Sequence, residues 1–410
     1  MENLNEKQKK VHHEILLCKN AFITGFAGSG KSYLTMFIYS TLLKLGKNVA
    51  LTAMTGCASV LINARTLHST LGIGLARDPP EILVKKMCKR EGMFNYLLNL
   101  EVLIIDEVSM LSDELFDKIA EYFRIIHKSD KPFGRLQIVL VGDMSQLKPV
   151  EGDYCFYSQC WDRLDINVCV LTENMRVDND LPFHDLLMQL RSGKISDLAI
   201  IETMRSNDFE NMDIKPTRLF ATNKRVDEIN EYEIHKLVSS GNRLDNYSII
   251  YSKNPCHLKA SKKYIQENKI PEFTSVCIGS QVMITRNIED NIVNGSRGIV
   301  VGTAQKFVTI KLIDGRDYNL FYFHVTDQEN KDIDFKYLPL TLAWAMTIHK
   351  SQGATIDLIE IDLGESIFAP GQAYVALSRA RSSKNVKITN FSKKSIRADK
   401  RIVQFYKKYT

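Results

Sequence analysis

A glycine-rich stretch near the N-terminus has the residues needed to hold phosphate groups. In GFAGSGKS, the residues Gly25, Gly30, Lys31 and Ser32 match the spacing G-x-x-x-x-G-K-[ST]. In this pattern backbone N–H groups close around the phosphates, the lysine reaches the β and γ oxygens, and the serine hydroxyl meets Mg²⁺. An apolar run precedes the glycines and a helical pattern follows, so a nucleotide site is favoured over a chance glycine-rich turn.

A second candidate for chemistry is the acidic pair in VLIIDEVSM. Asp106 and Glu107 end an apolar run that predicts a strand. The first carboxylate would hold Mg²⁺, through water, and the second would orient and activate an attacking water. The alternative is that both acids cap a helix beginning near Ser112, which the upstream phosphate loop disfavours.

Phosphoryl transfer also needs positive charge on the γ-phosphate in the transition state. Arg176 in LTENMRV and Arg379 in YVALSRAR are the candidates. From the residues alone, each of these arginines could equally be a solvated or ion-paired arginine on the surface.

A further polar stretch, TIHKSQG, occupies residues 347–353. Its lysine suggests a second phosphate cradle, but the stretch lacks the glycines and the preceding strand of one. The run 343–352 predicts a helix that stops at Gly353.

Composition excludes several classes of protein. With 410 residues, 44% hydrophobic and 25% charged, the chain is neither disordered nor fibrous and is long enough for two domains. Lys and Arg exceed Asp and Glu by 54 to 48, a net charge of +6 that suits an anionic partner without requiring one. The cysteines lack CxxC pairs, which favours reduced thiols. No run approaches the ~18 apolar residues of a membrane helix, and no signal or transit peptide is visible, so we expect an intracellular protein.

The elements that must position these residues follow an α/β pattern. Short apolar runs at 21–25, 48–53, 101–107 and 136–143 alternate with helical segments such as 112–123, as in a parallel sheet covered on both faces. Ligands of such sheets gather at the carboxyl ends of the strands. The pattern begins again near residue 175, so we expect lobes at 1–174 and 175–410. The second lobe carries a small antiparallel barrel at 276–338, and the first carries an irregular excursion at 66–90.

Together these residues resemble a known family, the superfamily 1 helicases of the Pif type, which are 5′-to-3′ DNA helicases related to RecD-like enzymes. The resemblance covers nearly the whole chain. Most diagnostic is the helix plus Lys-Pro-Phe-Gly at residues 112–134, between the acidic strand and the next strand. The ordered set of motifs is LNEKQ, GFAGSGKS, TAMTGCAS, TLHSTLGIG, IIDEVSM, GDMSQLKPV, LTENMR, LFATNKRVDEIN, NGSRGIV, TIHKSQG and YVALSRAR.

The resemblance implies two RecA-like lobes, a wedge-like insertion in the first and an SH3-like β-barrel in the second. It also assigns the nucleotide site, with ATP and Mg²⁺ as cofactors. Gln8 would read the adenine edge, Gln146 would sense the γ-phosphate, and Arg176 and Arg379 would complete the site. Asp143 would tie Gln146 to metal-bound water or only cap the turn after Gly142. The further nucleotide-binding residues are Gly25, Gly28, Ser29, Gly30, Lys31, Ser32, Gln352 and Gly353, with Ser32 and Asp106 at the metal.

Single-stranded DNA would lie across both lobes, by the same resemblance. Thr55, Thr222 and Asn223 could instead cap the helices that follow them, and His68 could be a packed core histidine. The chain departs from the family pattern at Met144 and Lys148, and after Arg176, which leaves the detail of the DNA contact near Pro149 open. The expected DNA contacts are Thr55, Gly56, His68, Ser69 and Pro149 in the first lobe and Thr222, Asn223, His349 and Lys350 in the second.

The expected mechanism is ATP-driven translocation by a monomeric motor on single-stranded DNA and on tailed or forked duplexes, with no membrane partner. Residues 72–80, GIGLARDPP, are the candidate wedge, and the barrel would help to hold the DNA path. One alternative is a DNA-stimulated motor subunit of a recombination or nuclease complex that unwinds little alone. A second is an ATP-gated clamp without turnover. The nucleus or a site of viral DNA replication would suit the activity, and replication, repair and recombination all remain open as its pathway.

Overall fold

The computed structural model describes residues 4–173, 180–196, 198–210, 212–268, 270–289, 292–326 and 333–409. The chain forms two compact units. The first unit comprises residues 1–177, 187–194 and 396–410, and the second comprises residues 178–186 and 195–395.

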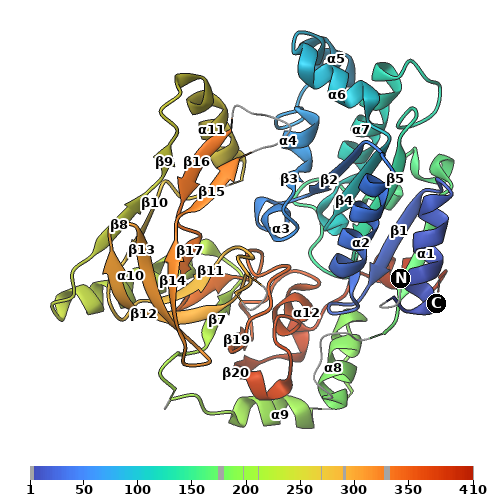
Figure 1. Ribbon diagram of the computed structural model, residues 1–410. Helices are drawn as coiled ribbons and strands as arrows, with labels where there is room; N and C mark the ends of the chain where they lie inside the picture. Colours follow the sequence, from blue (N-terminus) through green and yellow to red (C-terminus); the bar gives the residue numbers. More distant parts are fainter. Residues whose placement is uncertain are drawn as a thin grey trace. The chain divides into compact units, whose positions relative to one another are not determined.

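The first unit is built on a six-stranded sheet in the order β3-β2-β4-β5-β1-β6, with every pair parallel. Four of its strands are buried at every residue, as expected for a sheet covered on both faces (Figure 1). The expected parallel sheet is therefore confirmed. The strands are β1 (Ala21–Gly25), β2 (Val49–Ala53), β3 (Arg65–Thr66), β4 (Val102–Asp106), β5 (Gln137–Gly142) and β6 (Asn167–Leu171).

Alternate residues of these strands pack into two separate hydrophobic cores. Ile23 and Ile104 pack on one side with α1 (Glu6–Leu16), α2 (Lys31–Lys44) and α3 (Gly56–Leu61). Phe22 and Leu103 pack on the other side. This division follows from the two-residue period of a strand. The helices of the second side are α4 (Leu67–Leu71), α5 (Pro80–Cys88), α6 (Glu91–Asn99), α7 (Asp113–Ile126) and α13 (Lys400–Tyr406).

The C-terminal helix α13 belongs to the first unit, although the sequence placed all of 175–410 in the second lobe. Its aromatic side chains explain the return, because Phe405 lies against Phe22, Phe156 and Trp161 in the core of the first unit. Burying these large aromatic rings stabilises the packing of α13 on the first unit more than the residue pattern within the helix does.

The segment between β4 and β5 has a strict steric requirement. Ser112 caps α7, since its side chain accepts a hydrogen bond from the Leu115 N–H at 3.2 Å. Gly134, in the Lys-Pro-Phe-Gly turn, has φ +64°, and a Cβ there would lie 2.5 Å from Nδ1 of His127. Only glycine fits this position, which lets Phe133 pack against Phe116 with ring centroids 5.0 Å apart.

The excursion at 66–90 is mostly helical. Residues 72–79 connect α4 to α5, and Ile73 and Ala76 in this loop are buried. The ammonium group of Lys118 donates to the Ala76 carbonyl at 2.6 Å. Leu75 is 75% exposed, so it forms an apolar tip on an otherwise anchored loop.

The second unit contains a four-stranded parallel sheet in the order β18-β7-β19-β20. Its strands are β7 (Thr217–Phe220), β18 (Ala345–Thr347), β19 (Ile359–Leu363) and β20 (Val386–Phe391). The helices are α8 (Leu181–Arg191), which spans the division between the units, α9 (Ala199–Ser206), α10 (Asn223–Ser239) and α12 (Gln372–Leu377). Short 3₁₀ turns across the two units are η1 (Val108–Met110), η2 (Cys155–Tyr157), η3 (Trp161–Leu164), η4 (Ser383–Asn385) and η5 (Lys393–Ser395).

The helix predicted at 343–352 is wrong. Residues 345–347 form strand β18, in parallel register with β7, and residues 348–353 form turns that end at Gly353 with φ +82°. The run is too short for its period to distinguish a helix from a buried strand. Pairing with β7 satisfies its backbone groups and decides the outcome.

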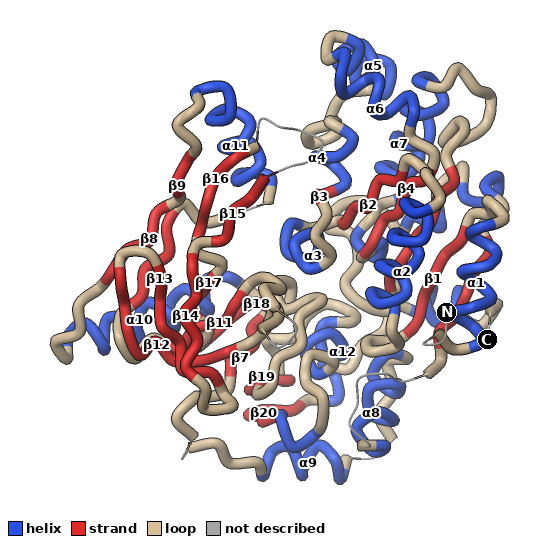
Figure 2. The backbone as a smooth tube through the Cα atoms, in the orientation of Figure 1, coloured by secondary structure: helices blue, strands red, loops and turns tan. Residues whose placement is uncertain are grey.

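Antiparallel strands interrupt this sheet between β7 and β18 (Figure 2). Five strands in the order β14-β13-β12-β11-β17 pack Val282, Val300 and Ile310 into a small core. The antiparallel strands begin before residue 276 and continue past 338. They are β8 (Asp245–Ser248), β9 (Ile250–Tyr251), β10 (Phe273–Val276), β11 (Gln281–Ile284), β12 (Arg297–Ala304), β13 (Phe307–Leu312), β14 (Asp317–Phe321), β15 (Phe323–Thr326), β16 (Asp334–Tyr337) and β17 (Leu340–Leu342), with α11 (Pro255–Glu267) beside them.

Within the described ranges, no helix is both long and apolar enough to span a bilayer. Free thiols are present at Cys18, Cys88, Cys155, Cys160, Cys169 and Cys277.

Candidate nucleotide and nucleic-acid sites

The glycine-rich loop connects β1 to α2 at the carboxyl edge of the first sheet. Gly28 and Gly30 have φ values of +94° and +81°, a backbone that glycine adopts without strain. A Cβ at Gly25 would lie 2.5 Å from Oγ of Ser29, so the loop must close tightly on itself. Ser32 is exposed in the first turn of α2. The conformation leaves backbone N–H groups available at a helix N-terminus, where an anion is stabilised.

Lys31 lies inside this loop. Its ammonium group donates to the carbonyls of Gly25 at 2.9 Å and Phe26 at 3.0 Å. Desolvation lowers the pKa of Lys31, and the carboxylates of Asp143, Glu107 and Asp106 oppose that shift. Ser29 Oγ is buried without a hydrogen-bond partner among the described residues. A phosphate group would supply an acceptor for Ser29 Oγ and a charged partner for Lys31.

The acidic pair occupies the end of β4, beside β5. Asp106 is buried, and burial together with the charge of Glu107 raises the pKa of its carboxyl. The Glu107 N–H donates to Oδ1 of Asp106 at 2.8 Å. Glu107 itself has φ +53°, a left-handed conformation that is costly for a residue with a side chain. A buried carboxylate next to a second acid is suited to a divalent cation, which would favour the charged form of Asp106.

The loop after β5 presents Asp143 and Gln146. Asp143 is fully buried and accepts hydrogen bonds from Nη2 of Arg191 at 3.0 Å and from the Ser145 N–H at 3.1 Å. Burial would raise the pKa of Asp143, but Arg191 and Lys31 hold it below its usual range. The Gln146 N–H donates to the Asp143 carbonyl at 3.0 Å. Asp143 therefore caps this turn, which is one of the two roles expected for it. Its carboxylate also interacts electrostatically with the ammonium group of Lys31.

Gln8 has an incomplete hydrogen-bond set. It forms a capping box with Asn5, donating its backbone N–H to Asn5 Oδ1 at 2.8 Å and accepting from the Asn5 N–H at 3.1 Å. Its Nε2 is buried without a partner in the described part of the chain. An unsatisfied amide donor is what recognition of an adenine edge requires, so these residues fit ATP.

In the second unit, Arg379 is buried at 2% exposure. Its Nη1 donates to the carbonyls of Ser351 at 3.2 Å and Ala354 at 3.3 Å, so the structure brings Arg379 together with the turn that contains Gln352 and Gly353. Arg176 lies outside the described residues.

The expected DNA contacts of the first unit are held by local bonds. Thr55 Oγ1 accepts from the Ala58 N–H at 3.2 Å, so this threonine does cap the helix that follows it. Ser69 is buried and accepts from Arg65 Nη2 at 2.9 Å, whereas Gly56 and His68 are half-buried.

The loop after β5 and the second unit present more exposed candidates. Pro149 is buried, and its neighbours Lys148 and Val150 form the surface of that loop, with Val150 87% exposed. Thr222 precedes α10 without a side-chain capping bond and is exposed, as is Asn223. His349 and Lys350 are exposed in the turns after β18. These last four side chains are available to a ligand.

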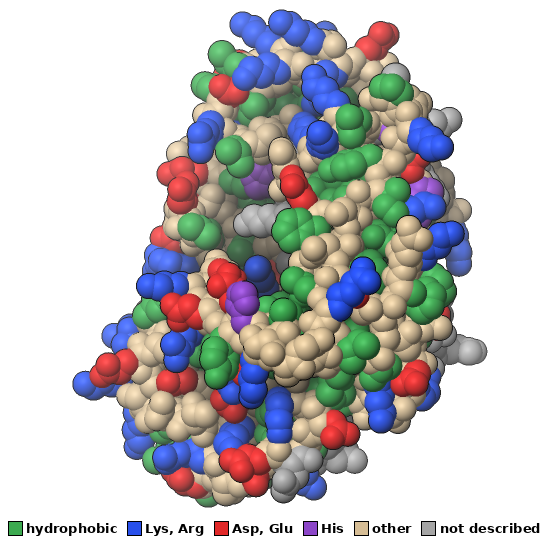
Figure 3. Space-filling view, turned by 90° about the vertical axis from the view of Figure 1, so that its left-hand side faces the viewer, with side chains coloured by type: hydrophobic (Ala, Val, Ile, Leu, Met, Phe, Trp, Pro, Cys, Tyr) green, Lys and Arg blue, Asp and Glu red, His purple; other side chains and the backbone are tan. Residues whose placement is uncertain are grey.

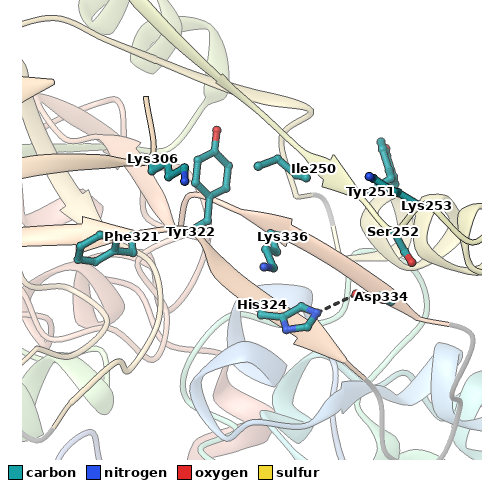
Figure 4. A pocket seen from close by; sticks show the side chains of 10 residues that line it. All are labelled: Ile250, Tyr251, Ser252, Lys253, Lys306, Phe321, Tyr322, His324, Asp334 and Lys336. Atoms are coloured by element: carbon teal, nitrogen blue, oxygen red, sulfur yellow. Dashed lines mark hydrogen bonds and ion pairs between the residues drawn. The ribbon is translucent and has the colours of Figure 1, made fainter. Parts of the chain in front are cut away.

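The antiparallel part of the second unit contains a groove with a volume of about 580 Å³ (Figure 4). Lys253, Lys306 and Lys336 line it together with aromatic rings that include Tyr322. Its described acid, Asp334, accepts a hydrogen bond at 2.7 Å from His324, which lowers the pKa of Asp334. Positive and negative side chains both occur on the face that Figure 3 shows, so net charge alone would not locate such a surface.

Sequence reasoning missed two residues beside the candidate nucleotide site. Arg191 of α8 pairs with Asp143, and the hydroxyl of Tyr406 in α13 donates to Asp143 Oδ1 at 3.2 Å. They lie 48 and 263 positions from Asp143 along the chain. Neither sits in a motif, so the sequence carried no signal for them.

Comparison with known proteins decides the family. A model of the PIF1-like helicase family matches residues 3–199. The chain is 33% identical to the ATP-dependent DNA helicase Pif1 of Bdellovibrio bacteriovorus, over 95% of this chain and 89% of that protein. The chain belongs to the PIF1-like helicase family. Human ATP-dependent DNA helicase PIF1 is 34% identical over 98% of this chain, which spans only 63% of the human protein.

Solved structures agree on the fold. Pif1 helicase from Candida albicans superposes with a TM-score of 0.81 at 30% identity, with both chains covered completely. Bacteroides Pif1 in complex with ADP-AlF3 and ssDNA gives 0.70 at 26% identity, covering 99% of this chain and 97% of that one. A structure of two coordinating Pif1 helicases at forked dsDNA gives 0.69 at 28% identity, with the same coverage. These matches confirm the predicted α/β fold of two RecA-like lobes and the expected class of ATP-dependent DNA helicase.

Glu107→Gln should lower the turnover number for ATP about 10²-fold or more, because the amide cannot accept the proton of an attacking water. Binding of a fluorescent ATP analogue should change little, since Glu107 is not expected to hold the phosphates. Steady-state ATPase assays with single-stranded DNA measure the first, and equilibrium titration the second.

The matched control is Glu101→Gln, just before the start of the same strand, where Glu101 pairs with Lys47 at 2.6 Å on the surface. This variant should turn over ATP like the unmodified protein. Equal activity of the Glu107 and Glu101 variants would exclude Glu107 as the base.

Proposed function

We propose that this chain couples Mg-ATP hydrolysis to 5′-to-3′ translocation on single-stranded DNA and thereby unwinds duplexes. The observation that carries the proposal is the convergence of three loops at the carboxyl edge of one sheet. They are the phosphate loop after β1, the acidic pair after β4, and the Asp143–Gln146 loop after β5. Gathered on adjacent strands, they bring together the parts that phosphoryl transfer needs.

Each side chain has a proposed task in hydrolysis. Ser32 and Asp106 would hold Mg²⁺, which neutralises charge on the phosphates when bound. Lys31 binds the β and γ oxygens, Glu107 orients water at the γ-phosphate, and Gln146 senses that phosphate. Arg379, and Arg176 outside the described part, would stabilise the transition-state charge, with Gln352 and Gly353 close to the nucleotide.

For movement, we propose that the two units alternate their grip on DNA during the ATP cycle. Thr55, Gly56, His68, Ser69 and the Pro149 loop would form one set of contacts. The exposed set is Thr222, Asn223, His349 and Lys350. One chain carries both sets, which supports a monomeric motor, while a second copy could assist at a fork.

Tailed and forked duplexes test the polarity and the activity together. With ATP and Mg²⁺ the protein should unwind 5′-tailed and forked substrates and leave 3′-tailed duplexes intact. A requirement for a 3′ tail would overturn the proposed direction. Strong DNA-stimulated ATPase with no unwinding of any substrate would instead support a motor subunit of a recombination or nuclease complex.

We propose Leu75 as the tip of the wedge in the 72–80 loop. Leu75→Ala should slow unwinding severalfold while leaving single-strand-stimulated ATPase unchanged, because an apolar side chain inserted at the junction helps to unstack a base pair. A single substitution is preferable to deleting the loop, since Ile73 and Ala76 are part of the core.

Leu45→Ala, at another leucine of the first unit that is 61% exposed, is the matched control. A Leu75→Ala protein that unwinds as fast as the Leu45→Ala protein would place the wedge elsewhere.

We also propose that the groove of the antiparallel part holds single-stranded DNA. Lysines and aromatic faces in one groove suit an anionic chain with stacking bases. Replacing both Lys306 and Lys336 by alanine should weaken DNA binding. The slope of log K against the logarithm of the salt concentration should become shallower by about 1.4, at ~0.7 for each single-strand phosphate contact.

The control pair is Lys236→Ala with Lys311→Ala, two exposed lysines of the same unit outside this groove. Fluorescence anisotropy at several salt concentrations measures both pairs. Identical salt slopes for the two double variants would remove the groove from the DNA path.

A further inference from the structure

The hydroxyl of Tyr406 joins two loops of the candidate ATP site. It lies 2.6 Å from Thr24 Oγ1 in β1, directly before the phosphate loop. It also accepts a hydrogen bond from the Met144 N–H at 3.0 Å and donates to Asp143 Oδ1 at 3.2 Å, both in the loop after β5. Tyr406 comes from α13, 262 positions after Met144.

The surroundings of this hydroxyl are closed and polar. Burial raises the pKa of Tyr406 far above its usual value, so the side chain stays neutral and keeps its proton to donate. The guanidinium of Arg191 lies over the Tyr406 ring, 4.2 Å from its centroid, and binds the same Asp143 carboxylate. Asp143 is thus held from two sides by residues of two distant helices.

We propose that Tyr406 is a positioning residue for ATP hydrolysis, acting through Asp143 and the loop that carries Gln146. This inference rests on the proposed function of that site. The hydroxyl bridges the strand that leads into the phosphate loop and the backbone that precedes the γ-phosphate sensor. Because Gln146 hydrogen-bonds to the Asp143 backbone, a shift of Asp143 moves the sensor relative to Lys31.

The role differs from simple core packing. The ring of Tyr406 packs with Phe405 and Arg191, and phenylalanine would retain those contacts. The hydroxyl alone makes the bridge, so its removal isolates positioning from packing. Hydrogen bonds that involve a charged group are stronger than neutral ones, and this one is shielded from water.

Tyr406→Phe should lower the turnover number of the DNA-stimulated ATPase about tenfold, the effect expected when one buried hydrogen bond to a charged group is lost. The KM for ATP should change less than about twofold, because the phosphate loop still binds nucleotide. Tyr409→Phe is the matched control: Tyr409 packs on Phe405 just beyond the same helix and is 42% exposed. It should behave like the unmodified protein.

A double-mutant cycle with Asp143→Asn decides whether Tyr406 acts through Asp143. If it does, Tyr406→Phe should have little further effect in the Asp143→Asn background. Full additivity of the two changes, an unchanged turnover number, or an equal loss in Tyr409→Phe would each overturn the proposal.

Hydrogen exchange of residues 142–147 supplies a readout that does not depend on turnover. Tyr406→Phe should speed exchange in this loop, and an unchanged rate would count against the bridge even if the protein hydrolysed no ATP. If Tyr406→Phe fails to fold, Thr24→Val removes the hydroxyl on the other side of the bridge and is expected to show the same split between turnover and KM.

Discussion

The buried carboxylate of Asp143 is the constraint on which the first unit depends. A charge removed from water is strongly destabilising unless a partner and hydrogen bonds accompany it. Arg191, Ser145 and Tyr406 provide them, and two of these three come from helices remote in the chain. Arg191 and Tyr406 lie in segments 187–194 and 396–410, which belong to the first unit. The same bonds place the carboxylate where it acts on Lys31.

The carboxyl edge of the parallel sheet turns this local arrangement into a site. Strands β1, β4 and β5 are neighbours, so the loops that follow them meet although Gly25 and Gln146 are far apart in the chain. Backbone strain accompanies the convergence. Glu107 is held at φ +53°, and its own N–H binds Asp106. Such strain persists because the surrounding core fixes the end of β4 on both faces.

The second unit also places candidate residues after the strands of a parallel sheet, which here has four strands. Its four strands place Thr222 and Asn223 after β7 and the 348–353 turns after β18, adjacent strands of one sheet. The guanidinium of Arg379 donates to the carbonyls of Ser351 and Ala354 in this region. The antiparallel strands between β7 and β18 add an aromatic and basic groove without disturbing the parallel sheet.

The sequence by itself determined the parts whose information is local. Glycine spacing specified the phosphate loop, apolar runs ending in acids specified β4 and β5, and the ordered motifs specified the family. Tertiary structure alone decided three things. It made residues 345–347 a strand, because pairing with β7 outweighed a weak helical pattern. It returned α13 to the first unit, because aromatic burial acts across any sequence distance. It also selected Arg191 and Tyr406 as partners of Asp143. A buried charge is hydrogen-bonded by the donors that the fold brings near it, and the spacing of residues along the chain does not indicate which donors these are.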